Sequence, residues 1–417
     1  TPKALTGSII ADNKTYDGTP TGTGAVSLDG LVTGDVVGTT GTTFTFADKN
    51  AGTGKIVNVT GTALTGADSG NYTLTIPATA LADILRKAIT ASITVNGKNY
   101  DGTTAATGSV ALNGVVSGDD VGTAGTSFTF ADKNAGAGKA VDVAGTTLTG
   151  GDSGNYTLTI PATAFADILK KALTASVSAN GKTYDGTTAA TGSVALNGVV
   201  SGDSVSTAGV TFTFTDRNAG TGKAVTVGGA LSGADAGNYT VSLPATVLAD
   251  ILKKALTATV TANGKTYDGT TAATGSVALN GVVSGDSVST AGIIFTFADK
   301  NAGTGKAVTV GGALSGADAG NYTISLPATV LADILKKALT ATVTANGKTY
   351  DGTTAATGSI ALNGVVSGDS VGTTGTSFTF ADKNASAGKT VNVTGTALTG
   401  ADSGNYSLTV PATVLGD

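Results

Sequence analysis

The feature that most constrains this chain is an internal repeat. The stretch "TANGKTYDGTTAATGSVALNG" at residues 261–281 returns with small changes around five tyrosines, Tyr16, Tyr100, Tyr184, Tyr267 and Tyr350. The spacings between these tyrosines are 84, 84, 83 and 83 residues. A fixed period of this size indicates a tandem array of similar folding units. Any interpretation of the stretch must therefore hold five times over.

The period predicts five domains of about 83 residues each. We place them at residues 1–85, 86–169, 170–252, 253–335 and 336–417. The units differ in length at one place, where Lys139 to Asp152 spans 13 positions but Lys223 to Asp235 spans 12. A surface turn absorbs such a loss easily, so we predict a loop there.

Several reactive side chains are missing from the sequence. There is no His, Cys, Met or Trp, and all 29 acidic residues are Asp. Without His, Cys or Glu the chain has no His-based triad, no thiolate nucleophile and no structural zinc site. The Asp residues do not fall in a "DxDxDG" calcium loop. We therefore predict no enzyme activity, no cofactor and no metal site.

The charges of the sequence argue against a nucleic-acid partner, and its apolar stretches argue against a membrane span. The net charge is −5 and the charges are thinly spread, so there is no basic face for nucleic acid. The longest apolar stretches, such as "VLADILKKAL", contain Asp and Lys and are shorter than the ~20 residues of a spanning helix. We predict no membrane span, and we interpret the opening "TPKALTG" as part of a processed or longer protein.

Residues 253–335 serve as the reference unit. Alternating apolar and polar side chains predict strands in "ALTATVTA" (255–262) and "GSVALNGVV" (275–283). A strand, a polar loop and a return strand are predicted over 293–310, and a turn-rich loop followed by a strand over 312–327. Six or seven short strands per unit make an all-β fold, a tandem array of five small β-sandwich-like domains.

Two dipeptides favour tight hairpins in this unit. Asn263-Gly264 follows the first predicted strand, and Asn280-Gly281 lies between Leu279 and Val282. Type I′ turns need positive φ at both central residues, which Asn and Gly tolerate. We predict type I′ hairpins, with Asp29-Gly30 in the first unit as the counterpart of Asn280-Gly281.

The junction "PATVLADILKKALTA" (327–341) has apolar residues at helical spacing. Thr329, Val330 and the β-favouring residues that follow argue against a helix. We favour a strand that runs almost directly into the next unit, and keep the helix as the alternative. The junctions offer one Asp each beside two basic residues, too few oxygens for calcium: Asp83 with Arg86-Lys87, Asp167 with Lys170-Lys171, Asp250 and Asp333.

The segments "NGKTYDGTTAAT", "FTFADKNAGTGKAVTV" and "SGADAGNYT" resemble the YDG repeat family along the whole chain. That family comprises glycine-rich, mostly-β modules of large bacterial haemagglutinin-like surface adhesins. The resemblance implies an exported, Gram-negative-type surface protein in which these domains form a stalk. It implies no catalytic residues. Because the chain is all repeat, the resemblance leaves the adhesive end and the anchor undefined.

The tyrosine and aspartate of the repeated stretch each have two interpretations. Tyr267 either stacks on a ligand or packs in the core with its hydroxyl on a backbone carbonyl, which is the usual state of a buried tyrosine. Asp268 before Gly269 either helps to hold calcium or forms an Asx turn onto its own backbone. We favour the core tyrosine and the Asx turn.

Two modifications are open from the residue types alone. Lys265 and Lys306, with Asp299 and Asn321, could form a Lys–Asn amide crosslink, which needs a buried protonated acid beside the pair. An "NY[ST]" glycosylation sequon occurs in every unit, at Asn71, Asn155, Asn238, Asn321 and Asn405. Turn geometry also explains these asparagines, and we favour that explanation.

We expect a structural function: a stalk or spacer segment of a large extracellular adhesin, cell-surface or secreted. One alternative is a filament that assembles by β-strand addition between sheet edges. The other is a carbohydrate-binding module. Any surface ligand would then bind regions of the protein outside this sequence.

Overall fold

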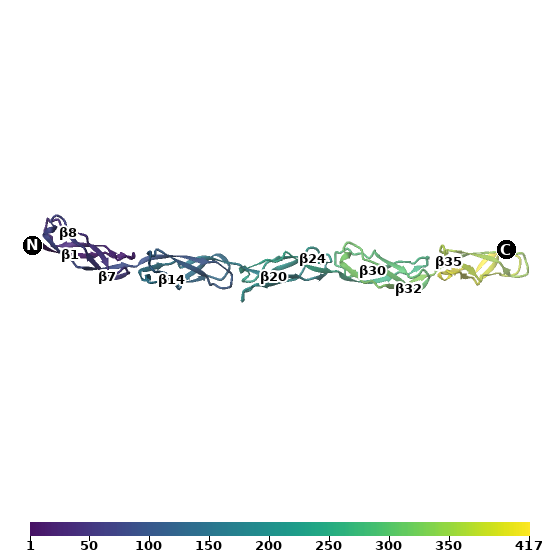
Figure 1. The fold of residues 1–417 in the computed structure, drawn as a ribbon. Coiled ribbons are helices and arrows are strands. Elements are labelled where there is room, and N and C mark those ends of the chain that lie inside the picture. Colours follow the sequence, from purple (N-terminus) through teal and green to yellow (C-terminus); the bar gives the residue numbers. More distant parts are fainter. The chain divides into compact units, whose positions relative to one another are not determined.

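The computed structural model describes residues 1–417, and almost every element in it is a β-strand (Figure 1). Its helical segments are three-residue 3-10 turns, one of which is η4 (Ala319–Asn321), and none is long or apolar enough to cross a membrane. The chain divides into two compact units. Unit 1 comprises Thr1–Ser176, Val194–Val210 and Gly229–Leu243, and unit 2 comprises Val177–Ser193, Thr211–Gly228 and Pro244–Asp417.

Repeat 4 shows the architecture of a repeat: two sheets that enclose a core. In the smaller sheet β27 (Lys254–Ala262) pairs antiparallel with β30 (Gly275–Asn280) and parallel with β33 (Tyr322–Ile324). The larger sheet has the order β28-β34-β32-β31-β29. Its strands are β28 (Lys265–Thr266), β29 (Ala272–Ala273), β31 (Ile293–Phe297), β32 (Gly303–Gly312) and β34 (Thr329–Leu335).

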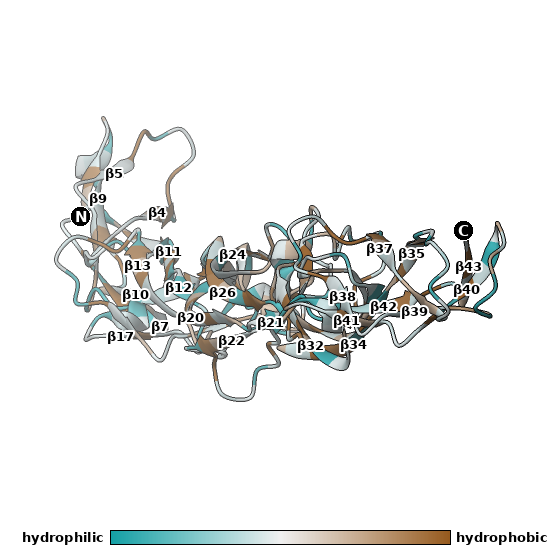
Figure 2. Ribbon diagram, turned by 90° about the vertical axis from the view of Figure 1, so that its right-hand side faces the viewer, coloured by the Kyte–Doolittle hydropathy of each residue, from teal (hydrophilic) through white to brown (hydrophobic).

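The core lies between these two sheets because side chains alternate along each strand. On the larger sheet Phe297, Val308 and Ile334 are at most 1% exposed and pack together with Tyr267. The intervening residues, many of them Thr, point outward to solvent. Figure 2 shows brown hydrophobic residues in the strands and pale or teal residues in many of the loops. The predicted all-β array of small sandwich-like repeats is confirmed.

The other repeats keep the long strands of repeat 4 in the same order, and repeats 1, 2 and 5 each add a two-stranded sheet of three-residue strands. Repeat 1 has β1 (Lys3–Ala11), β2 (Lys14–Thr15), β3 (Thr21–Gly22), β4 (Gly24–Asp29), β5 (Gly38–Thr40), β6 (Thr43–Phe46), β7 (Gly52–Thr60), β8 (Ala63–Thr65), η1 (Ser69–Asn71), β9 (Tyr72–Thr75) and β10 (Thr79–Leu85). Repeat 2 has β11 (Lys87–Asn96), β12 (Lys98–Asn99), β13 (Thr107–Asn113), β14 (Gly122–Ala124), β15 (Ser127–Phe130), β16 (Gly136–Ala144), β17 (Thr147–Thr149), η2 (Ser153–Asn155), β18 (Tyr156–Thr159) and β19 (Thr163–Leu169).

Repeats 3 and 5 complete the series. Repeat 3 has β20 (Lys171–Ala179), β21 (Lys182–Thr183), β22 (Gly192–Asn197), β23 (Val210–Phe214), β24 (Gly220–Gly229), η3 (Ala236–Asn238), β25 (Tyr239–Val241) and β26 (Thr246–Leu252). Repeat 5 has β35 (Lys337–Ala345), β36 (Ala355–Ala356), β37 (Gly358–Asn363), β38 (Gly372–Thr374), β39 (Ser377–Phe380), β40 (Lys389–Thr394), β41 (Ala397–Thr399), η5 (Ser403–Asn405), β42 (Tyr406–Thr409) and β43 (Thr413–Gly416).

The segment that joins repeats 4 and 5 is strand, as predicted. β34 ends at Leu335 and β35 begins at Lys337, so a single residue separates the last strand of one repeat from the first of the next. The apolar residues at helical spacing lie on opposite faces of the strand. Ile334 is buried at 1% exposure, whereas Leu331 and Leu335 are 68% and 59% exposed. Pairing with β32 and β28 therefore overrides the helical spacing.

The predicted type I′ hairpins are wrong. Every residue of the chain with positive φ is a glycine, so Asn280 does not adopt the φ that this turn needs, although Gly281 has φ +98°. The strands on either side of each dipeptide belong to different sheets, which is why no hairpin closes there. After Asn263-Gly264, β28 joins the larger sheet, and after Asn280-Gly281 the next strand, β31, does so too. The predicted hairpin at 293–310 is confirmed as the pair β31 and β32.

Candidate functional site: the junction between repeats

The tyrosine of the YDG stretch lies at the end of its repeat, against the next one. Tyr267 is 1% exposed, and its ring meets the ring of Tyr406 in repeat 5 edge-on, with centroids 5.4 Å apart. Its hydroxyl donates a 2.7 Å hydrogen bond to Oδ2 of Asp369, also in repeat 5. The prediction that the ring of Tyr267 packs in the core is therefore confirmed. The predicted backbone-carbonyl partner is wrong, because a carboxylate from the next repeat occupies that place.

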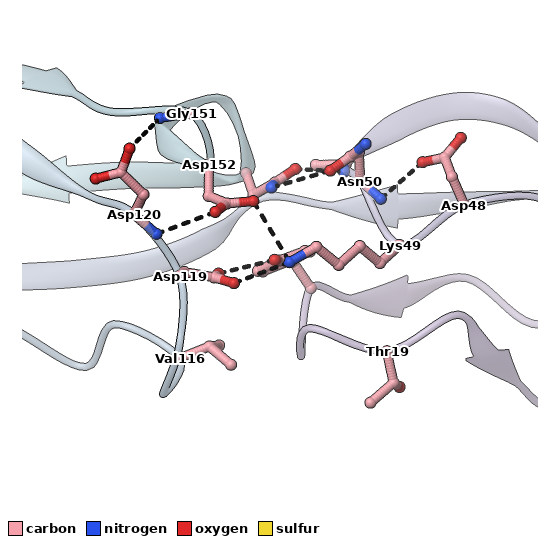
Figure 3. A network of polar contacts seen from close by, with 12 residues as sticks. Thr19, Asp48, Lys49, Asn50, Val116, Asp119, Asp120, Gly151 and Asp152 are labelled. Carbon is pink, nitrogen blue, oxygen red and sulfur yellow. Dashed lines mark hydrogen bonds and ion pairs between the residues drawn. The ribbon is translucent and has the colours of Figure 1, made fainter.

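The same contact joins repeats 1 and 2, where a buried carboxylate is its centre (Figure 3). The Asp119 side chain is 3% exposed, and its Oδ2 accepts hydrogen bonds from the hydroxyls of Tyr16 at 2.7 Å and Tyr156 at 2.5 Å. Nζ of Lys49 lies 3.0 Å from Oδ1. Two phenols and an ammonium thus compensate the desolvation of one carboxylate.

The pKa values of these groups reflect this arrangement. Burial raises the pKa of Asp119, but the hydrogen bonds from Tyr156, Tyr16 and Lys49 outweigh it, so the pKa is lowered overall. Burial and the bond to Asp119 raise the pKa of Tyr156 to about 12. The bond to Asp119 also raises the pKa of Lys49. Asp119 is therefore ionised at neutral pH, and its hydrogen-bond donors remain protonated.

A second aspartate and an asparagine complete the junction. A dashed line in Figure 3 joins Lys49 to Asp152, and Nζ of Lys49 lies 3.4 Å from Oδ1 of Asp152. Asn155 accepts a 2.8 Å hydrogen bond from the backbone N–H of Ala51 and donates one of 3.3 Å to Asn50. We call the surface with Tyr16, Lys49 and Asn50 the tail face of repeat 1, and the surface with Asp119, Asp152 and Asn155 the head face of repeat 2.

These contacts recur at the three later junctions. Lys133 lies 3.0 Å from Asp203 and 3.5 Å from Asp235 between repeats 2 and 3. Arg217 replaces the lysine between repeats 3 and 4 and divides its guanidinium between Asp286 and Asp318. The tyrosine pairs are Tyr16–Tyr156, Tyr100–Tyr239, Tyr184–Tyr322 and Tyr267–Tyr406, each with ring centroids 5.4 Å apart.

The Asp-Gly of the YDG stretch serves the same junction. Asp268 accepts a 2.9 Å hydrogen bond from the backbone N–H of Thr270, which confirms the Asx turn, and pairs with Lys265 at 2.7 Å. Gly269 has φ +81°, and a Cβ there would lie 2.9 Å from Cγ1 of Val366 in the next repeat. Only glycine satisfies both conditions, because it tolerates the φ and leaves room for the valine.

The structure brings together two residues of the Lys–Asn crosslink hypothesis, Lys306 and Asp299, but Asn321 contacts neither lysine. Lys306 forms an ion pair with Asp299, and Lys265 bonds Asp268 and Thr270. Asn321 instead lies on the head face of repeat 4, where it accepts from the N–H of Ala219 in repeat 3. The crosslink therefore lacks its geometry.

Four of the five sequon asparagines are too buried in the folded chain to carry a glycan, because they are 4–5% exposed and face the preceding repeat. They are Asn155, Asn238, Asn321 and Asn405. Asn71, in repeat 1, is exposed.

The aspartates of the connecting strands have other partners. Oδ1 of Asp83 accepts a 2.7 Å hydrogen bond from the N–H of Gly54. Equivalent bonds are formed by Asp167, Asp250 and Asp333. No group of three or more acidic side chains in the chain has the arrangement to hold a metal ion. The carboxylates that do approach a neighbouring repeat, such as Asp119 and Asp152, share a lysine.

Sequence reasoning missed the residues that hold the repeats together. The basic residue of "DKN", or of "DRN" in repeat 3, is followed by the aspartate of "SGD" in the next repeat after 70 or 69 positions, as Lys49 with Asp119 and Lys300 with Asp369 show. That pairing of opposite charges is a sequence signal, but periodicity alone does not say which loops meet. The contacts of the junction hold neighbouring repeats together.

The fold and this junction define a tandem array of small all-β repeats. The family model described as "YDG domain" matches residues 1–80, 85–164, 169–247, 252–330 and 335–414. The chain therefore belongs to the YDG domain family, which confirms the resemblance. No curated protein matches the chain by sequence.

Proposed function

We propose that this chain is a structural spacer, a stalk segment of a large bacterial cell-surface or secreted adhesin. The observation that carries the proposal is the use of the YDG motif. Tyr267, Asp268 and Gly269 contribute a cross-repeat hydrogen bond, an Asx turn and a close approach to the next repeat. The most chemically distinctive residues of the repeat are thus used to join repeats.

The junction favours a defined geometry between neighbours. A tether with one free residue, as between Leu335 and Lys337, allows little independent motion. Side-chain contacts from loops on both sides add further constraints. A spacer needs this combination because a flexible string of domains would not hold a binding region away from a cell surface.

Neither alternative function has comparable support. Four of the tyrosines that could stack on a sugar are buried at 1% exposure: Tyr16, Tyr100, Tyr184 and Tyr267. A filament built by strand addition remains a separate candidate, and a concentration series by light scattering tests it.

Small-angle scattering tests the spacer proposal directly. A repeat of short strands is about 35–40 Å long at ~3.3 Å per residue, so a rigid array of five would have a maximum dimension on the order of 170–200 Å. A variant with all four buried YDG tyrosines changed to alanine should show a broader distribution of dimensions. A compact wild-type particle would refute the proposal. A glycan array with reproducible hits would favour the binding module.

A further inference from the structure

The first two strands of a repeat run beside its last two strands, in the same direction. In repeat 4, β27 and β33 form a parallel pair in which Lys254 lies opposite Tyr322. Farther along, β28 and β34 form a second parallel pair in which Thr266 lies opposite Leu335. Lys254 is the first residue of β27, and Leu335 is the last residue of β34. The parallel pairing therefore begins where the chain enters the repeat and ends where the chain leaves it.

Backbone contacts also connect the two ladders. β27 and β34 are in contact although they belong to different sheets. Gly264 lies where the chain passes from β27 to β28, and a Cβ there would be 3.1 Å from the carbonyl oxygen of Asp333 in β34. Just after β28, the N–H of Tyr267 donates a 2.9 Å hydrogen bond to the carbonyl of Leu335. We call residues 254–267 the entry segment and residues 322–335 the exit segment.

The same arrangement occurs in repeats 1, 2 and 3. Each has a longer parallel pair followed by a two-residue pair: β1 with β9 and β2 with β10, β11 with β18 and β12 with β19, and β20 with β25 and β21 with β26. The hydrogen bond from the tyrosine N–H to the leucine carbonyl is 2.8 Å long in all three: Tyr16 to Leu85, Tyr100 to Leu169 and Tyr184 to Leu252. The pairing of entry and exit segments is therefore a property of the repeat.

Tension along the chain would load these segments along their length. The entry segment is pulled from its start and the exit segment from its end, because a single residue connects neighbouring repeats, as Lys336 does between β34 and β35. Two parallel strands pulled from opposite ends must slide along each other. The bonds of both ladders then carry the force together, since a slip of one residue, ~3.3 Å, breaks all of them. Force across the strands would instead break the bonds one after another.

We propose that each repeat is a tension-bearing unit, in which the parallel pairing of the entry and exit segments resists force along the chain. Such resistance depends on the rate of forced unfolding and not on the equilibrium stability of the repeat. A small domain of ordinary stability can therefore bear tension when its strands are loaded along their length. The inference rests on the strand order inside a repeat, so it is separate from the spacer proposal.

Single-molecule pulling of repeat 4 within the full chain tests this proposal. The chain contains no cysteine, so introduced cysteines are the only thiols for attaching handles. Ala255→Cys with Leu335→Cys pulls along the strands, from the start of the entry segment and the end of the exit segment. Thr257→Cys with Thr323→Cys pulls across them, from diagonal neighbours about 8 Å apart, too far for a disulfide. All four residues are exposed, so the core is unchanged.

The two variants unfold the same repeat, so each is the control for the other and only the direction of the force differs. At equal loading rate, we expect the force that unfolds repeat 4 to be at least about twofold higher along the strands than across them. Equal forces, or a lower force along the strands, would overturn the proposal.

The unchanged chain offers a second measurement, with handles at its two termini. We expect it to lengthen in discrete steps of about 260 Å, because ~83 residues at ~3.6 Å each replace a folded length of about 35–40 Å. Gradual lengthening without such steps would also overturn the proposal. A compact particle in small-angle scattering would refute the spacer proposal but would leave these unfolding forces unchanged.

Discussion

The carboxylate of Asp119 offers the sharpest test of the junction, through the substitution Asp119→Asn. The asparagine keeps the shape of the side chain but removes the charge that two tyrosine hydroxyls and Lys49 share. The side chain is 3% exposed, so water does not replace what is lost. The substitution therefore isolates the contribution of the charge.

The size of the effect follows from the hydrogen bonds. Bonds to a charged group contribute about 1.5–3 kcal/mol each and neutral bonds about 0.5–1.5 kcal/mol, so two tyrosine bonds lose about 2–3 kcal/mol together. We leave the half-exposed Lys49 out of this sum because solvent screens its contribution. A loss of this size makes opening of the junction roughly 30- to 150-fold more frequent.

Hydrogen exchange measured by mass spectrometry reports this opening locally. The N–H of Ala51 donates across the junction to Asn155, so it exchanges faster when repeats 1 and 2 separate. The N–H of Ala135 makes the equivalent bond to Asn238 at the next junction and serves as the internal control. If exchange at Ala51 stays within about threefold of the wild-type rate, the charge-centred account of the junction is refuted.

Four further predictions concern pH, glycine, tyrosine and calcium. The lowered pKa of Asp119 and the pKa of Tyr156 near 12 mean that the junction is at full strength from about pH 5 to 9. The junction loses stability when the pH drops below 3.8, the ordinary pKa of aspartate, and when the pH rises above 10.0, the ordinary pKa of tyrosine. Thermal unfolding measured across this pH range would show both losses. Gly269→Ala should destabilise the chain by about 1–3 kcal/mol more than Gly352→Ala. Both substitutions place a Cβ at a positive φ, but only the Cβ at position 269 would contact a valine of the next repeat. Equal denaturation midpoints for the two variants would contradict this prediction. Limited nitration followed by peptide mapping should modify Tyr350 before its four buried counterparts, and uniform modification would count against the covered junctions. Excess chelator should leave junction hydrogen exchange and the maximum dimension in small-angle scattering unchanged, and a marked change would reveal a metal site.

Much of the architecture is determined by the sequence itself. The 83–84-residue period defines the array, and two-residue alternation in segments such as 255–262 defines strands with one buried face. Asp268 before Gly269 predicts a local Asx turn, which the structure contains. The period is found by comparing the sequence with itself, and the strands and the Asx turn are predictable because they depend on neighbours a few residues apart.

The tertiary structure decided where the chain reverses and which contacts the recurring residues of each repeat make. Asn280-Gly281 has hairpin chemistry, but its flanking strands belong to different sheets, and only the packing of the two sheets determines that. The partner of Tyr16 lies 103 positions away, in a loop of the next repeat. No local pattern identifies such a partner, because burial of a carboxylate becomes favourable only when donors from two repeats meet around it.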